Sequence, residues 1–429
     1  MLTPPTQLPW KHRLSWSGGW FAASVWAGVF PLVAAPAPHR VWGACAAVGY
    51  LCAAVAALWP RGRGPSVALA LAGAVAVPLL VLLVGGGAQS EVGVIERSGV
   101  LTLHQATPYL PDPRAVLDVT PYLPGMAAFG LPRAVLGDSG WLPGLLGDAR
   151  LWCAAAFLGC LWAAHRTTGQ GAGGRGPGGR GSGRTGAARR GTARRDAVGA
   201  FVASPVTALP LCVSGVDLPL IGLLFLALAY AARRRPVAAG LALAAACSLK
   251  WTAWPALAVA VALLAQRGGA RAAVRGAGVA VAGTVLLVLP SALLSPGPLW
   301  QQVFAFPTGR GPWETPAASP LPGRLLADLG PAGWYAAVAL LLIGGAAVAV
   351  SLAVRQPYDL VSAADRLAVG LCVAFLLAPA GRFGYLALPV ALAVLARLVD
   401  GARRAEPVRS PVVRASRPAR PAPAAWGAR

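Results

Sequence analysis

The sequence predicts an all-α protein that crosses a membrane many times, as a polytopic bundle of about twelve transmembrane helices. Three observations predict this class. Hydrophobic residues make up 56% of the chain and charged residues 12%, which is more apolar surface than a water-soluble fold can bury. The apolar residues form runs long enough to cross a bilayer. The arginines lie in short segments between those runs, as is typical of cytoplasmic loops.

Residues 1–165 are expected to form an N-terminal group of transmembrane helices with one long outer loop. The expected spans lie at about 19–36, 42–59, 66–86 and 150–164. Basic residues flank the first two spans, so the positive-inside rule places their flanks in the cytoplasm. The third span then delivers residues 87–149 to the outer face, as a loop that we expect to carry short helices. This loop holds six acidic residues: Glu91, Glu96, Asp112, Asp118, Asp138 and Asp148.

Two basic segments, 166–196 and 401–429, are expected to be disordered and cytoplasmic. The first is rich in glycine and arginine and nearly free of apolar residues, and the second is rich in proline, alanine and arginine. An RGG-like nucleic-acid segment and a contact with anionic lipids are alternatives for the first, but a solvated linker is favoured. The formal charge of +23 therefore reflects loop arginines, and no nucleic-acid partner is predicted.

Residues 197–400 are expected to form a second transmembrane bundle. Spans at about 197–213 and 218–232 leave Asp217 at the outer face. Further spans are expected at about 275–293 and 333–354.

Two polar hairpins are expected within this second bundle. Arginines flank the apolar run around Lys250 on both sides, so two short helices must turn there at the outer face, with Trp251 and Trp254 at interface depth and Pro255 opening the next helix. The same argument applied to the run 367–398 places Arg382 and Tyr385 at a second outer turn.

The polar residues of these segments converge at one membrane face. Ionisable residues at membrane depth are costly, so they are candidates for function. Structural alternatives exist for each one: Lys250 could snorkel from a helix end, Arg382 could pair with an outer-loop carboxylate, and Asp217 could cap the helix that follows it. The converging set comprises Glu91, Glu96, Asp217, Lys250, Arg382 and Tyr385.

These residue types suit sugar transfer from a polyprenyl phosphate. Arginine binds phosphate as a fork and lysine as a point charge, while a carboxylate can take a proton from an attacking hydroxyl. A transporter or flippase for an anionic lipid or glycan precursor could use the same charges, and it stays as the alternative. Internal repeats would favour a transporter.

Three stretches resemble one known family. The central stretch "GVDLPLIGLLFLALAYAARRRPVAAGLALAAACSLKWTAWP" resembles the signature of glycosyltransferase family 87, the polyprenol-phosphate-mannose-dependent α-mannosyltransferases of actinobacterial cell envelopes. The outer-loop stretch "QSEVGVIERSGVLTLHQATPYL" is similar to that family's acidic loop, and "GRFGYLALPV" is similar to its C-terminal arginine-containing stretch. The resemblance implies a GT-C-like fold with its active site on the extracytoplasmic face of the cell membrane.

The resemblance also implies roles for particular residues. It makes Glu91 the first candidate for the general base and Glu96 the second, although relatives often have aspartate there. It assigns the donor phosphate to Lys250 and Arg382. The sugar or acceptor pocket would be lined by Asp217, Tyr385, His104, Tyr109, Trp251 and Trp254.

The implied partners are a polyprenyl-phosphate sugar donor, an envelope glycan or glycolipid acceptor, and membrane lipids. The sugar would be mannose, and its transfer would invert the anomeric carbon. No cofactor and no metal ligands are predicted. A divalent metal is an open alternative that the sequence does not support, because relatives tend to have two acidic residues where this chain has Asp217 alone.

Other chemistries find no support in the sequence. The seven cysteines lie singly in or beside apolar runs, with no CxxC pair, so they indicate buried small side chains and not a disulfide framework or a zinc site. The chain has no H-E-x-x-H, no phosphate-binding G-x-x-x-x-G-K-[ST] and no nucleophile elbow.

Overall fold

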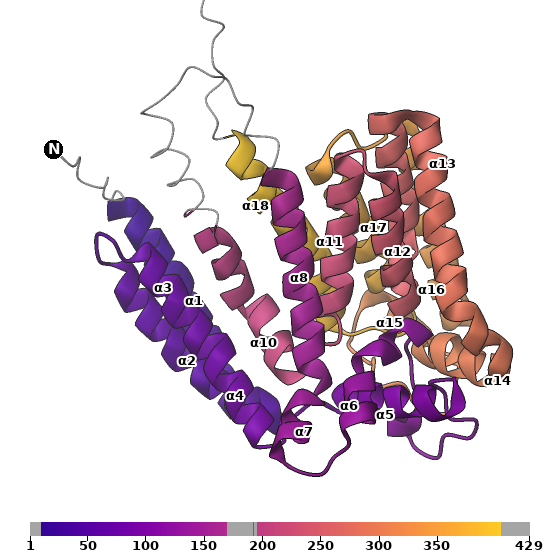
Figure 1. Ribbon diagram of the computed structural model, residues 1–429, viewed down its shortest axis with the longest axis horizontal. Coiled ribbons are helices and arrows are strands. Elements are labelled where there is room, and N and C mark those ends of the chain that lie inside the picture. Colours follow the sequence, from indigo (N-terminus) through magenta and orange to yellow (C-terminus); the bar gives the residue numbers. More distant parts are fainter. Residues whose placement is uncertain (1–9, 170–191, 193–194, 405–429) are drawn as a thin grey trace, which may run out of the picture.

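The computed structural model of the protein describes residues 10–169, 192 and 195–404. These residues are almost wholly helical, and the β-type pairing among them is a single isolated bridge between Ala318 and Gly381. The predicted all-α class is therefore confirmed. The long helices run side by side, and short helices gather at one end of the bundle (Figure 1).

The first helices pack through very small residues. Gly49 and Gly73 meet backbone to backbone, because a Cβ on Gly49 would lie 2.5 Å from the Cα of Gly73. Gly73 lies in a π-helical turn, where the Ala74 carbonyl accepts a hydrogen bond of 2.9 Å from Trp42 Nε1. The elements are α1 (Trp10–Val33), α2 (Ala37–Ala57), α3 (Arg63–Leu71), η1 (Ala72–Ala76) and α4 (Val77–Val84).

The predicted acidic loop forms a cap of short helices at one end of the bundle (Figure 1). Gly99 and Gly130 let two of these helices approach closely, since a Cβ on Gly99 would lie 2.1 Å from the Gly130 carbonyl carbon. The elements are α5 (Ser90–Gln105), η2 (Val116–Asp118), η3 (Pro124–Phe129), α6 (Leu131–Leu136) and α7 (Trp141–Leu146).

The core of the bundle surrounds α11, in which 13 of the 15 residues are buried. It packs against α8, α12, α13, α17 and α18. A bent pair, Arg195–Ala203 and α10, precedes it with an angle of 59° between its halves. The elements of this part are α8 (Ala149–Gly169), α10 (Pro205–Val213), α11 (Leu218–Ala232) and α12 (Pro236–Leu249).

The long element α13 (Pro255–Leu294) reverses direction at Gly269, whose φ of 80° and ψ of 175° are not helical. Leu264 lies against Gly276, where a Cβ would be 2.5 Å from Leu264 Cδ1. Positions twelve residues apart on a straight helix would be about 18 Å apart, so the two halves of α13 form an antiparallel hairpin.

In the C-terminal third, short elements alternate with long helices. After the turn η4 (Trp251–Ala253) and α13 come α14 (Pro296–Leu299), η5 (Trp300–Ala305), η6 (Phe306–Thr308), α15 (Pro322–Ala327), α16 (Pro331–Val354), α17 (Leu360–Leu377), η7 (Phe383–Leu386) and α18 (Ala387–Arg404). The predicted outer segments thus share one end of the bundle, where α5, α6, α7, α14 and α15 lie (Figure 1). At the other end, Arg267 Nη1 donates to the Tyr358 carbonyl at 3.4 Å, which joins the turn of α13 to the α16–α17 connection.

Among the described residues, five helices are long and apolar enough to cross a membrane, and six if the bent pair counts as one span. The sequence predicts about twelve. The difference has three causes. The helices α11, α12 and Phe383–Val399 are apolar but only 10–17 residues long, and the two halves of α13 count together. In addition, α1 and α8, which contain the predicted spans 19–36 and 150–164, are long enough but are not among the sufficiently apolar helices. The number twelve therefore stays a prediction. Most of the segments predicted to be disordered, 166–196 and 401–429, lie outside the described residues, although α8 continues to Gly169 and α18 to Arg404.

Candidate active site

An ion pair between Glu91 and Arg382 joins the acidic loop to the turn before η7, both predicted to lie at the outer face. Glu91 lies in the first turn of α5, and Arg382 immediately precedes η7. Arg382 Nη1 donates to Glu91 Oε1 at 2.7 Å across 291 residues of sequence. Burial alone would lower the pKa of Arg382, but the hydrogen bond to Glu91 and the negative charge of that same carboxylate hold the pKa above its ordinary value. Arg382 therefore stays charged at any physiological pH.

Backbone contacts hold Arg382 in place. The segment around it pairs with the loop that follows η6: Gly381 N donates to Ala317 O at 2.9 Å, and Ser319 N donates to Gly381 O at 3.0 Å. The Arg382 Nε donates in turn to Pro316 O at 3.2 Å. The acidic loop and the loop after η6 thus fix the direction of the guanidinium.

A buried arginine fixes the start of α5, and with it Glu91. Arg150 is 1% exposed and is paired with Asp148. Its Nη1 donates to Gly87 O at 2.7 Å and to Cys212 O at 3.0 Å, so it ties the segment before α5 to the end of α10. Because these partners are backbone carbonyls, the contact depends on the fold and not on neighbouring side chains.

A second ion pair, between Lys250 and Asp217, lies at the turns before α11 and after α12. Lys250 follows the last residue of α12 with an extended backbone, and its Nζ donates to Asp217 Oδ1. Asp217 precedes α11, but its side chain makes no cap hydrogen bond there. Asp217 is thus engaged by the lysine and not by the helix.

The ring of Tyr122 packs against the ammonium group of Lys250. The Lys250 ammonium lies 4.9 Å from the centre of the Tyr122 ring, in a cation–π contact. Burial raises the pKa of the Tyr122 phenol well above its ordinary value, and Glu91 and Asp217 raise it further. Tyr122 is therefore a neutral ring at physiological pH, with its face available to a cation.

Tyr122 and Tyr385 bring the two ion pairs into one site. Each tyrosine lies within electrostatic range of Glu91, Asp217 and Arg382, and of the other tyrosine. Tyr385 is half-buried and its ring packs on Phe375, with 5.6 Å between the ring centres. The structure thus places five of the six residues of the predicted converging set around Tyr122.

Backbone contacts also position Tyr122. The amide of the next residue, Leu123, donates to Leu249 O at 3.0 Å, beside Lys250. Tyr109 is 1% exposed, and its hydroxyl donates to Tyr122 O at 2.9 Å. Tyr109 therefore holds the backbone of Tyr122 in position and does not line the site itself.

Sequence reasoning missed Tyr122, although the sequence carries a signal for it. The pentapeptide TPYLP occurs twice, at 107–111 and 120–124, and PRAVL occurs at 113–117 and 132–136. Buried Gln302 bridges the two TPYLP copies, because its Oε1 accepts from Thr120 N at 2.9 Å and its Nε2 donates to Leu110 O at 2.7 Å. The duplication could have indicated that the loop contains two equivalent tyrosines, one in each copy.

Glu96 lies apart from Glu91. Five residues along an α-helix correspond to a rotation of about 500°, so the two carboxylates leave α5 in directions about 140° apart. Glu96 Oε2 accepts from Arg133 Nε at 3.0 Å, and its Oε1 accepts from Ala149 N at 3.1 Å. Glu96 thus binds α6 and the start of α8 together, with both oxygens engaged.

The remaining predicted residues lie outside the cluster of ion pairs. His104 is exposed near the end of α5, thirteen residues and about 20 Å along the helix from Glu91. Trp251 and Trp254 pack on Phe304, with ring centres 6.3 Å and 6.0 Å from it. They form an aromatic patch next to Lys250, and Trp254 is 45% exposed. Across residues 10–169, 192 and 195–404, no three His, Cys, Asp or Glu side chains lie close enough together to hold a metal ion.

Comparison with known proteins identifies the family. A family model described as Glycosyltransferase family 87 matches residues 120–379, well over half of the chain. This segment includes Tyr122, Asp217 and Lys250, and it ends just before Arg382. Searches of curated proteins and of solved structures find no match. The chain therefore belongs to glycosyltransferase family 87, and it is a membrane glycosyltransferase.

Proposed function

We propose that the protein transfers mannose from a polyprenyl-phosphate donor to an envelope glycan or glycolipid at the outer face of the cell membrane. The observation that carries this proposal is the pairing of Glu91 with Arg382 and of Asp217 with Lys250 around Tyr122. Sugar transfer from a lipid phosphate needs cations for the phosphate and a carboxylate for the attacking hydroxyl, and this site offers both.

Lys250 and Arg382 would hold the donor phosphate without giving up their present partners. Lysine has three donor hydrogens, and one is directed to Asp217. Arginine has five, and Arg382 uses Nη1 for Glu91 and Nε for Pro316 O, which leaves Nη2 for a phosphate oxygen. Asp217 acts in this proposal as the group that orients Lys250.

Glu91 would be the general base. Its Oε1 is held by Arg382, while its Oε2 has one long contact, 3.5 Å from Ser90 Oγ. The acceptor hydroxyl oxygen attacks the anomeric carbon as the bond from that carbon to the phosphate oxygen breaks. The hydroxyl proton passes to Glu91 Oε2, and polyprenyl phosphate leaves with the bonding electrons. Attack opposite the leaving group inverts a β-linked donor to an α-linked product, with Tyr385 bordering the sugar.

The test is a transfer assay with purified protein in lipid, labelled polyprenyl-phosphate-mannose and a membrane glycolipid extract. Glu91→Gln is expected to lower kcat by about 10² to 10⁴, the usual contribution of a general base, while donor binding persists. Lys250→Ala is expected to weaken donor binding and transfer together. Asp112→Asn is the matched control, because Asp112 is an exposed carboxylate of the same loop.

Glu96→Gln separates the two candidate bases. It is expected to lower the melting temperature, because it weakens the contact with Arg133, and to leave kcat of the folded protein within about tenfold. Full turnover by Glu91→Gln would refute Glu91 as the base. Absence of transfer with any donor, together with protein-dependent movement of labelled lipid between leaflets, would refute the proposed sugar transfer. That result would favour the alternative, a transporter or flippase.

A further inference from the structure

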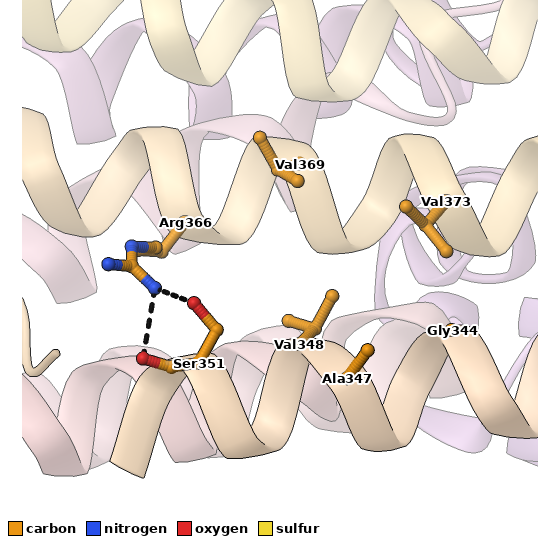
Figure 2. Close-up of a pocket in the computed structure, with 7 residues that line it drawn as sticks. All are labelled: Gly344, Ala347, Val348, Ser351, Arg366, Val369 and Val373. Atoms are coloured by element: carbon orange, nitrogen blue, oxygen red, sulfur yellow. Dashed lines mark hydrogen bonds between the residues drawn. The ribbon is translucent and has the colours of Figure 1, made fainter. Parts of the chain in front are cut away.

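A groove lies between α16 and α17, away from the candidate active site. Its volume is about 270 Å³, and valine side chains project into it from both helices (Figure 2). The groove is lined by Gly344, Ala347, Val348 and Ser351 of α16 and by Arg366, Val369 and Val373 of α17. Small residues on α16 leave a slot with apolar walls, and its polar residues lie at one end.

The polar end carries cations that no carboxylate neutralises within the described part of the chain. Arg366 Nη1 donates to the carbonyl of Ser351 at 3.1 Å and to its hydroxyl, and both acceptors are uncharged. The neighbouring carboxylate, Asp365, is occupied by both amino groups of Arg397. Arg355 is exposed one turn beyond Ser351, and its backbone N–H donates to the same carbonyl at 3.0 Å. Arg366 thus lies at the end of the slot, and the backbone of Arg355 follows one turn beyond Ser351.

The slot opens on a surface that faces outward from the bundle. Three of the residues that line the slot, Ala347, Ser351 and Val369, are exposed, and Val369 is 57% exposed. Such a surface suits lipid chains. Arg366 lies six residues from the start of α17, or about 9 Å along the axis, so its long side chain can reach the headgroup region.

We propose that this groove binds an anionic phospholipid, with an acyl chain in the slot and the phosphate on Arg366 and Arg355. One ligand then satisfies both parts of the site, because it carries a hydrocarbon chain for the slot and an anion for the arginines. A zwitterionic lipid is expected to bind less tightly, because the positive charge of its own headgroup is repelled by the arginines. The lipid comes from the leaflet opposite the candidate active site, so this proposal does not depend on the proposed function.

The test is a native mass-spectrometry titration of the full chain with phosphatidylglycerol and, separately, with phosphatidylcholine. The wild type is expected to bind phosphatidylglycerol more tightly. Arg366→Gln and Arg355→Gln are each expected to weaken that binding about tenfold, the usual effect of losing one charge-assisted hydrogen bond. Arg275→Gln removes an exposed arginine outside the groove, and it is expected to change the affinity by about twofold or less.

A third variant and a stability control complete the test. Ala347→Phe fills the slot and is expected to weaken binding of either lipid. The melting temperature of each variant is measured in phosphatidylcholine, and an unchanged value shows that a loss of lipid binding is not caused by unfolding. Arg355→Gln also keeps the hydrogen bonds between the Arg366 side chain and Ser351. Equal affinity of the wild type for both lipids would overturn the proposal. The proposal would also be overturned if Arg275→Gln weakened phosphatidylglycerol binding as much as Arg366→Gln does.

Discussion

Lys250 is held by a carboxylate and by an aromatic ring, and each stabilises its positive charge in a different way. Asp217 supplies the opposite charge, and the Tyr122 ring supplies an apolar surface whose quadrupole attracts a cation. An ammonium at membrane depth without such partners would be costly. The structure thus keeps one charged lysine at a turn while its other two hydrogens remain available to a ligand.

This arrangement makes the Tyr122 ring more important than its hydroxyl. Tyr122→Phe keeps the ring, so its KM for the lipid-linked donor is expected to stay close to that of the wild type. Tyr122→Leu removes the cation–π contact, worth about 0.5 to 2 kcal/mol, and is expected to raise KM by about twofold to thirtyfold with a smaller change in kcat. Steady-state kinetics on both variants measures the difference. Equal losses in both would assign the effect to the hydroxyl and contradict this interpretation.

Among the helices, α13 depends most on a single backbone position. Gly269 has a φ of 80° and a ψ of 175°, a region essentially restricted to glycine. Nothing lies within 4 Å of a Cβ built there, so the expected penalty of a side chain is backbone strain alone. The reversal at this residue lets Leu264 pack on Gly276.

Gly269→Ala is therefore expected to destabilise the protein by about 1 to 3 kcal/mol. Gly278→Ala is the matched control, because Gly278 lies within the helical second half of α13 with open space around its Cβ position. Alanine there is expected to be neutral or to stabilise by up to about 1 kcal/mol. Thermal unfolding in one detergent compares the two variants, and equal melting temperatures would show that the reversal carries no strain.

The elements were more predictable from the sequence than their contacts. Apolar runs and arginine flanks predict where helices lie, because burial in lipid and loop charge act locally along the chain. Lys250 at the end of α12 and Pro255 at the start of α13 follow from the same local signals. The engagement of Glu96 by Arg133 and Ala149 could not be predicted, because it depends on how α5, α6 and α8 pack. The bridge from Gln302 to the TPYLP copies spans more than 180 residues, and one sequence gives no indication of it.

At the scale of the whole molecule, the two ends of the bundle are chemically different. One end carries the cap of short helices and the paired carboxylates Glu91 and Asp217. The other carries the turn of α13 and Arg355, with Arg267 bonded to Tyr358 O. The positive-inside rule predicts that the second end faces the cytoplasm.

Cysteine labelling tests this orientation. In a variant whose seven native cysteines are replaced by alanine, Trp141→Cys places a thiol on the cap and Tyr358→Cys places one at the opposite end; the native side chains are 80% and 64% exposed. A membrane-impermeant maleimide is expected to label position 141 in intact cells and position 358 only after permeabilisation. The reverse pattern would place the candidate active site in the cytoplasm.

The 291 residues between Glu91 and Arg382 also set an order of events during biosynthesis. At a synthesis rate of about 5 to 20 residues per second, Glu91 leaves the ribosome roughly 15 to 60 s before its partner exists. Lys250 follows Asp217 by only 33 residues, so that pair can form within a few seconds by the same rate. The nascent chain thus carries an unpaired carboxylate through nearly the whole of its insertion, and ribosomes that stop before Arg382 release a product in which Glu91 has no arginine to hold it.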